Sequence, residues 1–222
     1  YLAKIVVLML TTLYTFIPNY GIVCILFAVI IRIFTGPLTK KSFISNQKMQ
    51  AIQPELKKVQ DKFKDKPKEL NQEILALYKK HKVNPLGGCL PILVQMPLLI
   101  ALFQVFRKTI EFRGAPFLPF WITDLSQPDI IFAPAFLRDL WGINFFYGHG
   151  IALLPIIMGI IMMMNMKLSA TTMQKSQMST MYIMNIFFIM LFNTFPSGLN
   201  LYYTIYNLLN FIQQRRLKKI EL

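Results

Sequence analysis

Arg32 is the residue of this sequence with the most unusual surroundings, because it lies inside the apolar stretch GIVCILFAVIIRIFTGPL at residues 21–38. A charged side chain in the middle of a membrane-spanning helix costs at least about 2.5–3.5 kcal/mol, so it should face protein or water. One interpretation is that the long side chain reaches the lipid headgroups, since the lysines begin nearby at Lys40. The other is a wet pocket in which the guanidinium attracts the carboxylates of whatever enters.

Amide side chains recur in the remaining apolar stretches, and these stretches hold no acidic residue that could neutralise Arg32. The amides are Gln95, Asn165, Asn193, Asn200, Asn207 and Asn210. They fit hydrogen bonds between helices, each worth about 0.6 kcal/mol. Together with an unpaired arginine, they fit better the lining of a wet pocket that is open to the cytoplasm.

The sulfur-bearing residues leave two interpretations open. Cys24 and Cys89 lie in apolar surroundings without metal-ligand spacing, which favours two small buried hydrophobic residues. The methionines of the apolar stretches are either lipid-facing filler or an adaptable apolar surface for varied helices. Those that could form such a surface are Met96, Met158, Met162 and Met164.

Enzymatic motifs are missing from the sequence. It has no Gly-rich phosphate loop, no HExxH, no GxSxG and no acidic pair inside an apolar stretch. His81 lies in a lysine-rich segment and His149 lies between two glycines, so we interpret both as surface or interfacial residues. We therefore expect no catalytic residues, no cofactor and no metal.

Composition and charge place the chain in the membrane. It is 55% hydrophobic and only 15% charged, and its apolar residues are gathered in long blocks. The net charge of +14 raises the alternative of a nucleic-acid ligand, but the charges are unevenly distributed. Residues 40–82 carry twelve lysines against five acidic residues, whereas residues 107–150 carry four of each sign. This asymmetry is typical of cytoplasmic and extracytoplasmic loops, so nucleic acid is not expected as the primary ligand.

The pattern predicts an all-α polytopic membrane protein with five transmembrane helices, an interfacial amphipathic helix before them and a cytoplasmic helical hairpin. The N-terminus of this segment should be extracytoplasmic and its C-terminus cytoplasmic. The predicted ranges are 1–18 for the interfacial helix, 19–38, 86–106, 150–166, 179–195 and 198–213 for the spans, 39–84 for the hairpin, 107–149 for an extracytoplasmic loop and 167–178 for a cytoplasmic loop.

Local signals set these boundaries. Gly36-Pro37 is expected to end the first span, and the segment at residues 84–88 returns the chain to the membrane. Apolar residues recur at helical spacing on either side of a turn at Asp65-Lys66-Pro67, which predicts the hairpin. The last three spans, at about 15 residues, reach only about 22 Å against a core of about 30 Å. We expect flanking residues to extend them or the bilayer to thin.

Several strings of the sequence, in order along nearly the whole chain, resemble the YidC family of membrane protein insertases. The first is Arg32 with Gly36-Pro37-Leu38-Thr39-Lys40 and, further on, Gln53-Pro54. The others are Lys82-Val83-Asn84-Pro85-Leu86-Gly87-Gly88-Cys89, Gln95-Met96-Pro97, Glu111-Phe112-Arg113-Gly114-Ala115-Pro116-Phe117, Asp124-Leu125-Ser126, Phe195-Pro196-Ser197-Gly198-Leu199 and Leu201-Tyr202-Tyr203.

The resemblance implies a non-enzymatic insertase and chaperone of the bacterial inner membrane. In that family a hydrophilic groove, open to cytoplasm and lipid and closed outside, holds the arginine that Arg32 matches. Nascent membrane proteins would slide along it into the bilayer, alone or beside the Sec translocon, and the hairpin would help to recruit them, including from ribosome–nascent chain complexes. Members of the family from Gram-negative bacteria carry an extra first span and a large periplasmic domain, which would precede Tyr1 here.

The groove residues assigned on this basis are Arg32, Gln95, Met96, Pro97, Asn165, Asn193, Tyr202 and Tyr203. Gln95 would form part of the wall, and the two tyrosines would lie on the apolar exit path. The alternative is a small transporter or channel that uses Arg32 as the counter-charge of an anionic solute. Such a protein should show interrupted helices in paired halves, and the sequence shows none.

Overall fold

The computed structural model describes residues 1–84, 87, 90–133, 150–169 and 175–220. Three expectations from the sequence therefore fall outside the described residues, wholly or in part. They are the return to the membrane at 84–88, the distal half of the long loop with Trp141 and Phe146, and the middle of the loop at 167–178.

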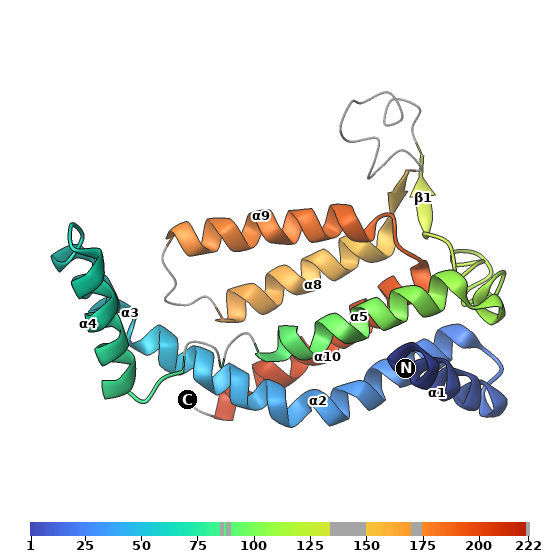
Figure 1. The fold of residues 1–222 in the computed structure, drawn as a ribbon. Coiled ribbons are helices and arrows are strands. Elements are labelled where there is room, and N and C mark those ends of the chain that lie inside the picture. The colour runs from blue at the N-terminus through green and yellow to red at the C-terminus, as the bar shows by residue number, and fades with distance from the viewer. Residues whose placement is uncertain (85–86, 88–89, 134–149, 170–174, 221–222) are drawn as a thin grey trace.

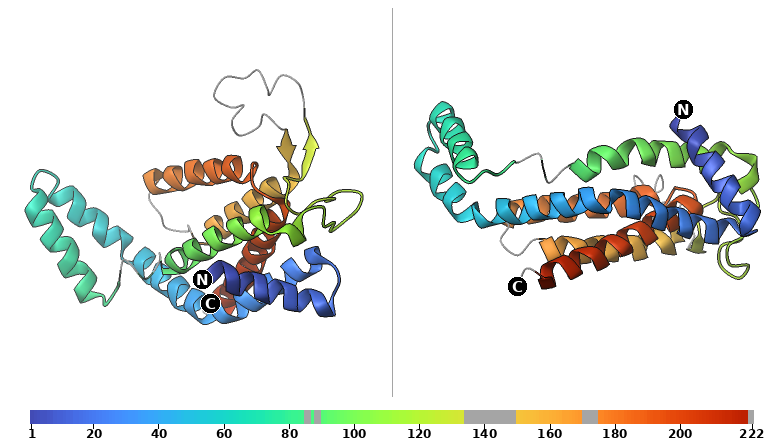
Figure 2. Two further views of the ribbon diagram at one scale, coloured as in Figure 1. Left: turned by 45° about the vertical axis from the view of Figure 1, so that its right-hand side comes forward. Right: turned by 90° about the horizontal axis from the view of Figure 1, so that it is seen from below.

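Most of the described chain is helical, and the longer helices run along one axis (Figure 1). α1 crosses one end of this bundle, whereas α3 and α4 project from the other end, near the C-terminus (Figure 2). The elements are α1 (Leu2–Phe16), α2 (Tyr20–Ala51), α3 (Gln53–Lys62), α4 (Pro67–Lys80), α5 (Leu90–Lys108), the 3-10 turn η2 (Ile110–Phe112), β1 (Ile130–Phe132), β2 (Ile151–Ala152), α8 (Leu153–Ser169), α9 (Lys175–Phe192) and α10 (Ser197–Ile220).

α2 does not end at Gly36-Pro37, so the helix break that the sequence predicted there is wrong. The helix continues to Ala51, although Pro37 has no N–H to donate to the preceding turn. The neighbouring helix holds this segment in place, because the side-chain amide of Gln213 donates to the carbonyl of Gly36 at 3.1 Å. Packing against α10 therefore outweighs the local helix-breaking signal, and the spanning segment and the start of the basic region form one rod.

A small β-ribbon departs from the all-α expectation. β1 pairs antiparallel with β2, so the helix predicted from residue 150 starts at Leu153 instead. Gly150 permits the turn into β2, because its φ of +120° is rarely adopted by residues with a side chain. A Cβ at this position would also lie 2.6 Å from the carbonyl oxygen of Phe132. The β-branched run at residues 130–131 was the available signal for this ribbon.

α3 and α4 lie side by side beyond the end of α2 (Figure 1). Leu56 and Leu77 are buried between them, and the turn falls just before Pro67, the first residue of α4. Glu55 lies 3.0 Å from the ring nitrogen of His81, and this hydrogen bond lowers the pKa of its carboxyl.

The packed core lies toward the α1 end of the bundle. Its fully buried side chains come from α1, α2, α5, α8 and α10 and from the loop after α5. The ring of Phe106 packs at a tilt against that of Phe112 with centroids 5.0 Å apart, and Gly198 leaves the space that Phe106 fills. The first turns of α10 are thereby fixed against α5 and the loop.

By length and composition, α2 alone among the described helices could cross a membrane. Shorter apolar helices cover Leu2–Phe16, Leu153–Leu168 and Met178–Phe192. Large apolar side chains on α5 and α9 face outward, among them Leu93, Ile100, Ile183 and Phe187. So much exposed apolar surface is unusual for a water-soluble monomer and suits contact with lipid.

Candidate functional site

Arg32 is buried between α2 and α10, with only 6% of its surface exposed. One terminal nitrogen donates to the hydroxyl of Thr39 at 3.0 Å. The other donates to the side-chain oxygens of Asn210, at 3.0 Å, and Gln213. The guanidinium carbon also lies 5.5 Å from the centre of the Tyr206 ring, within the range of a cation–π contact.

Helical spacing brings these groups together. Thr35 and Thr39 follow Arg32 at intervals of three and four residues, so all three lie on one face of α2. Tyr206, Asn210 and Gln213 follow one another at intervals of four and three residues and likewise share one face of α10. The hydroxyls of Thr35 and Tyr206 lie 3.1 Å apart and join the two faces.

The positive charge of Arg32 has only neutral partners among the described residues. All three hydrogen bonds go to a hydroxyl or amide oxygens, and the buried Nε makes none. A cavity of about 130 Å³ adjoins the guanidinium. It is lined mainly by polar side chains, namely Thr39, Ser42, Asn46, Tyr206, Asn210 and Gln214, with Phe43 beside them. The cavity is large and polar enough for several water molecules, which would complete the solvation of the cation.

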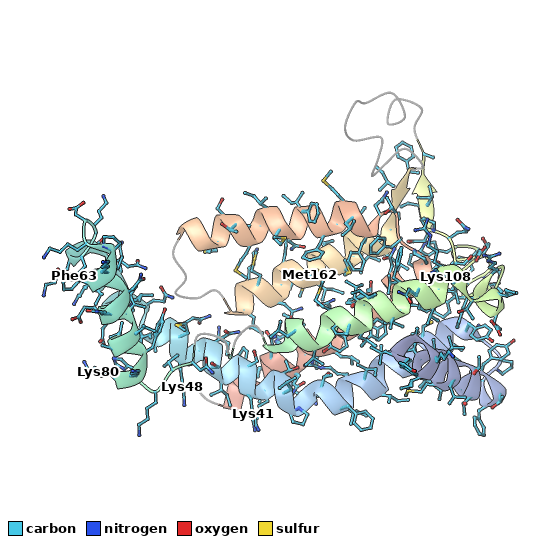
Figure 3. All side chains as sticks on the ribbon, viewed as in Figure 1. Lys41, Lys48, Phe63, Lys80, Lys108 and Met162 are labelled. Carbon is cyan, nitrogen blue, oxygen red and sulfur yellow. The ribbon has the colours of Figure 1, made fainter. Side chains whose placement is uncertain are left out.

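A larger groove of about 540 Å³ continues from this cavity between α2, α8, α9 and α10. Asn46, Asn210 and Gln214 line both spaces. The rest of the groove combines amides with flexible apolar side chains: Met49, Gln50, Gln53, Met162, Asn165, Met166, Met181, Met184, Asn185, Phe188 and Asn207. Met162 is labelled on α8 in Figure 3. A surface of this kind can adapt to an apolar helix and still solvate polar groups near it.

Some of the predicted site residues line the groove or the cavity beside Arg32, and others do not. Arg32 forms the site, and Asn165 lines the groove, where its amide donates to the backbone carbonyl of Asn207 at 3.2 Å. Gln95 approaches Thr35 and Tyr206 from α5. Met96 and Pro97 are exposed on α5 and line neither the groove nor the cavity beside Arg32.

The two predicted tyrosines lie behind the groove. Tyr202 is completely buried and Tyr203 is 7% exposed, and the ring of Tyr202 packs near that of Phe27. Gln95 comes near both hydroxyls, yet none of the three groups makes a well-formed hydrogen bond within the described residues. These tyrosines form a buried wall and do not present an exposed apolar face.

Asn193 lies at the other end of the bundle, where it holds the β-ribbon. Its amide nitrogen donates to the carbonyl of Gly150 at 2.8 Å, and its oxygen accepts from the N–H of Ala152 at 2.8 Å. Ser197 adds a hydrogen bond from its hydroxyl to the carbonyl of Asp124 at 3.0 Å. Asn193 is therefore a structural residue that joins α9 to β2.

Asp129 caps α8 in the same region, and its burial predicts a pH-dependent stability. It is 4% exposed, and one carboxylate oxygen accepts from the N–H groups of Leu153, at 3.1 Å, and Leu154, at 2.8 Å. Burial raises the pKa of this carboxyl, although the backbone N–H groups oppose the rise. The folded state therefore holds the proton more tightly than the unfolded chain, and stability falls as pH rises from the usual aspartate pKa through the raised one.

Asp129→Asn should remove this pH dependence while keeping an oxygen that accepts from the same N–H groups. We expect the thermal unfolding midpoint of the wild type to fall, relative to that of the variant, as the pH rises through this range. Circular dichroism of both proteins in detergent at a series of pH values measures it. Parallel curves for the two proteins would show that Asp129 does not titrate as its burial requires.

Several site residues were missed by the sequence reading. Thr39 and Gln213 hold the guanidinium but were placed at or beyond the ends of the predicted spans. The repeated spacing of 32, 35, 39 and of 206, 210, 213 was the signal that could have found them.

Comparisons with known proteins agree on one family. The family model described as "60Kd inner membrane protein" matches residues 12–221. The membrane protein insertase YidC of Pelodictyon phaeoclathratiforme is 42% identical over 205 residues, covering 92% of this chain and 34% of that protein. The insertase of the same name from Pelobacter propionicus is 39% identical over 219 residues, covering 99% of this chain and 39% of that protein.

A solved structure shares the fold. An active YidC insertase, crystallised with its first transmembrane domain resolved, superimposes with a TM-score of 0.67 at 27% identity. The match covers 95% of this chain and 44% of that one. The present chain thus spans about a third of the length of its curated relatives.

Proposed function

Because the chain belongs to the 60Kd inner membrane protein family, we propose that it is the membrane-embedded part of an insertase for newly made proteins of the bacterial inner membrane. The observation that carries this proposal is Arg32, a buried cation with neutral partners at the head of an adaptable groove. The proposed activity is binding and release, without covalent chemistry.

In this proposal α2, α5, α8, α9 and α10 cross the bilayer and α1 lies in its interface. The basic helices α3 and α4 stand in the cytoplasm, which places the C-terminus of α10 inside and the start of α2 outside. α8 and α9, with 17 and 18 residues, reach about 26–27 Å, slightly less than a typical hydrocarbon core. The bilayer beside them would be thinned, which shortens the path of a polar segment.

The mechanism follows from the polarity of the two spaces beside Arg32. The polar flank of a substrate enters the groove from the cytoplasm and exchanges water for amide side chains and the guanidinium. The apolar segment lies against methionines, whose flexible side chains fit different sequences. Transfer into lipid is then favoured by the burial of apolar surface, about 0.8 kcal/mol per CH₂ group. The Sec translocon and ribosome–nascent chain complexes are the partners we propose for delivery.

Insertion by the purified chain tests this function. The chain is reconstituted in proteoliposomes and given a single-span substrate with an acidic translocated flank. Protection of that flank from external protease, without an energy source, is the expected result. No protection above that of empty liposomes, with the chain folded and correctly oriented, would contradict an autonomous insertase activity.

A further inference from the structure

A second cavity adjoins Arg32 on a different face of α2 and α10 from the groove. Its volume is about 560 Å³. The side of α2 that lines it contains Ile33, Gly36, Pro37 and Lys40, whereas Thr39, Ser42 and Asn46 line the groove side. Leu209, Ile212, Gln213 and Arg216 of α10 complete it. Arg32 therefore lies between two spaces, one on each side of the contact between these helices.

The charge of this second cavity, which we call the rear cavity, is entirely positive. Arg32, Lys40 and Arg216 line it, and no carboxylate is found among the described residues that do so. Lys40 and Arg216 are exposed, and neither forms a salt bridge within the part of the chain that the structure describes. Three cations with no bound counter-charge favour an anionic occupant.

The two exposed cations lie at the same level. α2 and α10 run in parallel here, because Gly36 and Gln213 are hydrogen-bonded to each other and Arg32 is bonded to Asn210. Lys40 and Arg216 each follow that contact by about one helical turn. They therefore form one cationic mouth at the end of the cavity that lies toward the basic helices.

Below this mouth the wall is apolar. Ile33 is 69% exposed and Ile212 is 40% exposed, and Leu209 lines the same wall. Ile33 lies seven residues before Lys40, which is about 10 Å along the helix axis. A cationic mouth above an open apolar wall matches a phospholipid, with its phosphate at the mouth and an acyl chain along the wall.

We propose that the rear cavity binds an anionic phospholipid of the cytoplasmic leaflet, whose phosphate lies between Lys40 and Arg216. The orientation used here rests on the membrane placement given under the proposed function, but the binding itself is measured without any insertion assay. The bound headgroup brings a negative charge near Arg32 on the side away from the groove. It thereby offsets part of the cost of keeping an unpaired guanidinium in the protein interior.

Lipid binding to two charge-matched double variants tests the proposal. Lys40→Gln with Arg216→Gln removes the mouth, whereas Lys41→Gln with Arg215→Gln removes equal charge from neighbouring exposed positions that do not line the cavity. Lys41 lies on the same part of α2, as Figure 3 shows. Native mass spectrometry of the purified full chain, titrated with phosphatidylglycerol and with phosphatidylcholine, gives the affinities.

We expect the mouth variant to bind phosphatidylglycerol about tenfold more weakly or worse, and the control variant to stay within about twofold of wild type. Equal losses of phosphatidylglycerol affinity in the two variants would show that only the general surface charge matters and would overturn the proposal. Equal binding of phosphatidylcholine by the wild type would also overturn it, as would displacement of the lipid by inorganic phosphate.

A second measurement does not depend on the cationic residues. Ile212→Trp places a fluorophore on the cavity wall, and Leu208→Trp places one at an exposed position of α10 outside it. A small mole fraction of phosphatidylglycerol with brominated acyl chains should quench the first at least twice as strongly as the second. Equal quenching would mean that the lipid has no preferred place and would contradict the proposal.

Discussion

Replacing Arg32 by alanine is expected to slow the insertion of a single-span substrate with an acidic flank by about tenfold or more. The guanidinium is held by Thr39, Asn210 and Gln213, which leaves its charge unneutralised for an entering carboxylate. A hydrogen bond to a charged group contributes about 1.5–3 kcal/mol. Each 1.4 kcal/mol corresponds to a factor of ten. The initial rate of protease protection in proteoliposomes measures the effect.

Three comparisons separate this role from a general loss of charge or structure. Arg32→Lys keeps the charge but not the planar fork of donors, so it should retain part of the rate. Lys41→Ala removes a cation from an exposed position of the same helix and should leave the rate unchanged. A substrate with a neutral flank should be inserted by Arg32→Ala almost as fast as by wild type. The hypothesis fails if Arg32→Ala inserts the acidic-flank substrate at the wild-type rate, or slows both substrates equally.

The Asn193→Ala variant should be the most destabilised of the variants discussed here, by about 2–4 kcal/mol. The change leaves the N–H of Ala152 and the carbonyl of Gly150 without their 2.8 Å partners in a buried position. Each buried polar group left unpaired costs about 1–3 kcal/mol. For a chain of this size the thermal midpoint should fall by about 5–15 °C. Circular dichroism in detergent measures it.

Asn185→Ala is the matched control for that variant. Asn185 lies on α9, which ends one residue before Asn193, and it is also buried. Its one described hydrogen bond, to the carbonyl of Gly159, is long at 3.4 Å, and its side-chain oxygen has no partner among the described residues. Its replacement should therefore cost much less than that of Asn193. Similar midpoints for the two variants would show that the link between α9 and the β-ribbon contributes little to stability.

Arg32 could be found from the sequence because its signal is local and energetic. A cation within an apolar stretch needs an explanation wherever the helix packs. Its hydrogen-bond partners could not be assigned in the same way, since they depend on which face of α10 meets α2. The contact between Gln213 and Gly36 shows this dependence, because it joins α10 to α2 next to Pro37, where the sequence predicted an end.

The sequence alone also could not separate the roles of the buried amide side chains. Asn165 and Asn193 look alike in the sequence, as single amides in apolar stretches. In the structure Asn165 lines the groove, whereas Asn193 is hydrogen-bonded to the backbone of β2. Only tertiary packing separates the two roles. The ribbon itself was missed because two very short strands carry a weak pattern, and Gly150 marks a bend without specifying a strand.

Because α2 is continuous, it lines the groove and also connects the basic helices mechanically to Arg32. Arg32 and the attachment point of α3 at Ala51 belong to one helix and lie about 28 Å apart along its axis. Packing against α10 supports α2 beside Pro37, so a sideways force on α3 and α4 would act as a torque about the contact between α2 and α10. If α2 pivots at that contact, a displacement of several ångströms at Ala51 rotates the segment that carries Arg32 by a small angle. A force on the basic helices α3 and α4 would therefore change the position of the buried guanidinium.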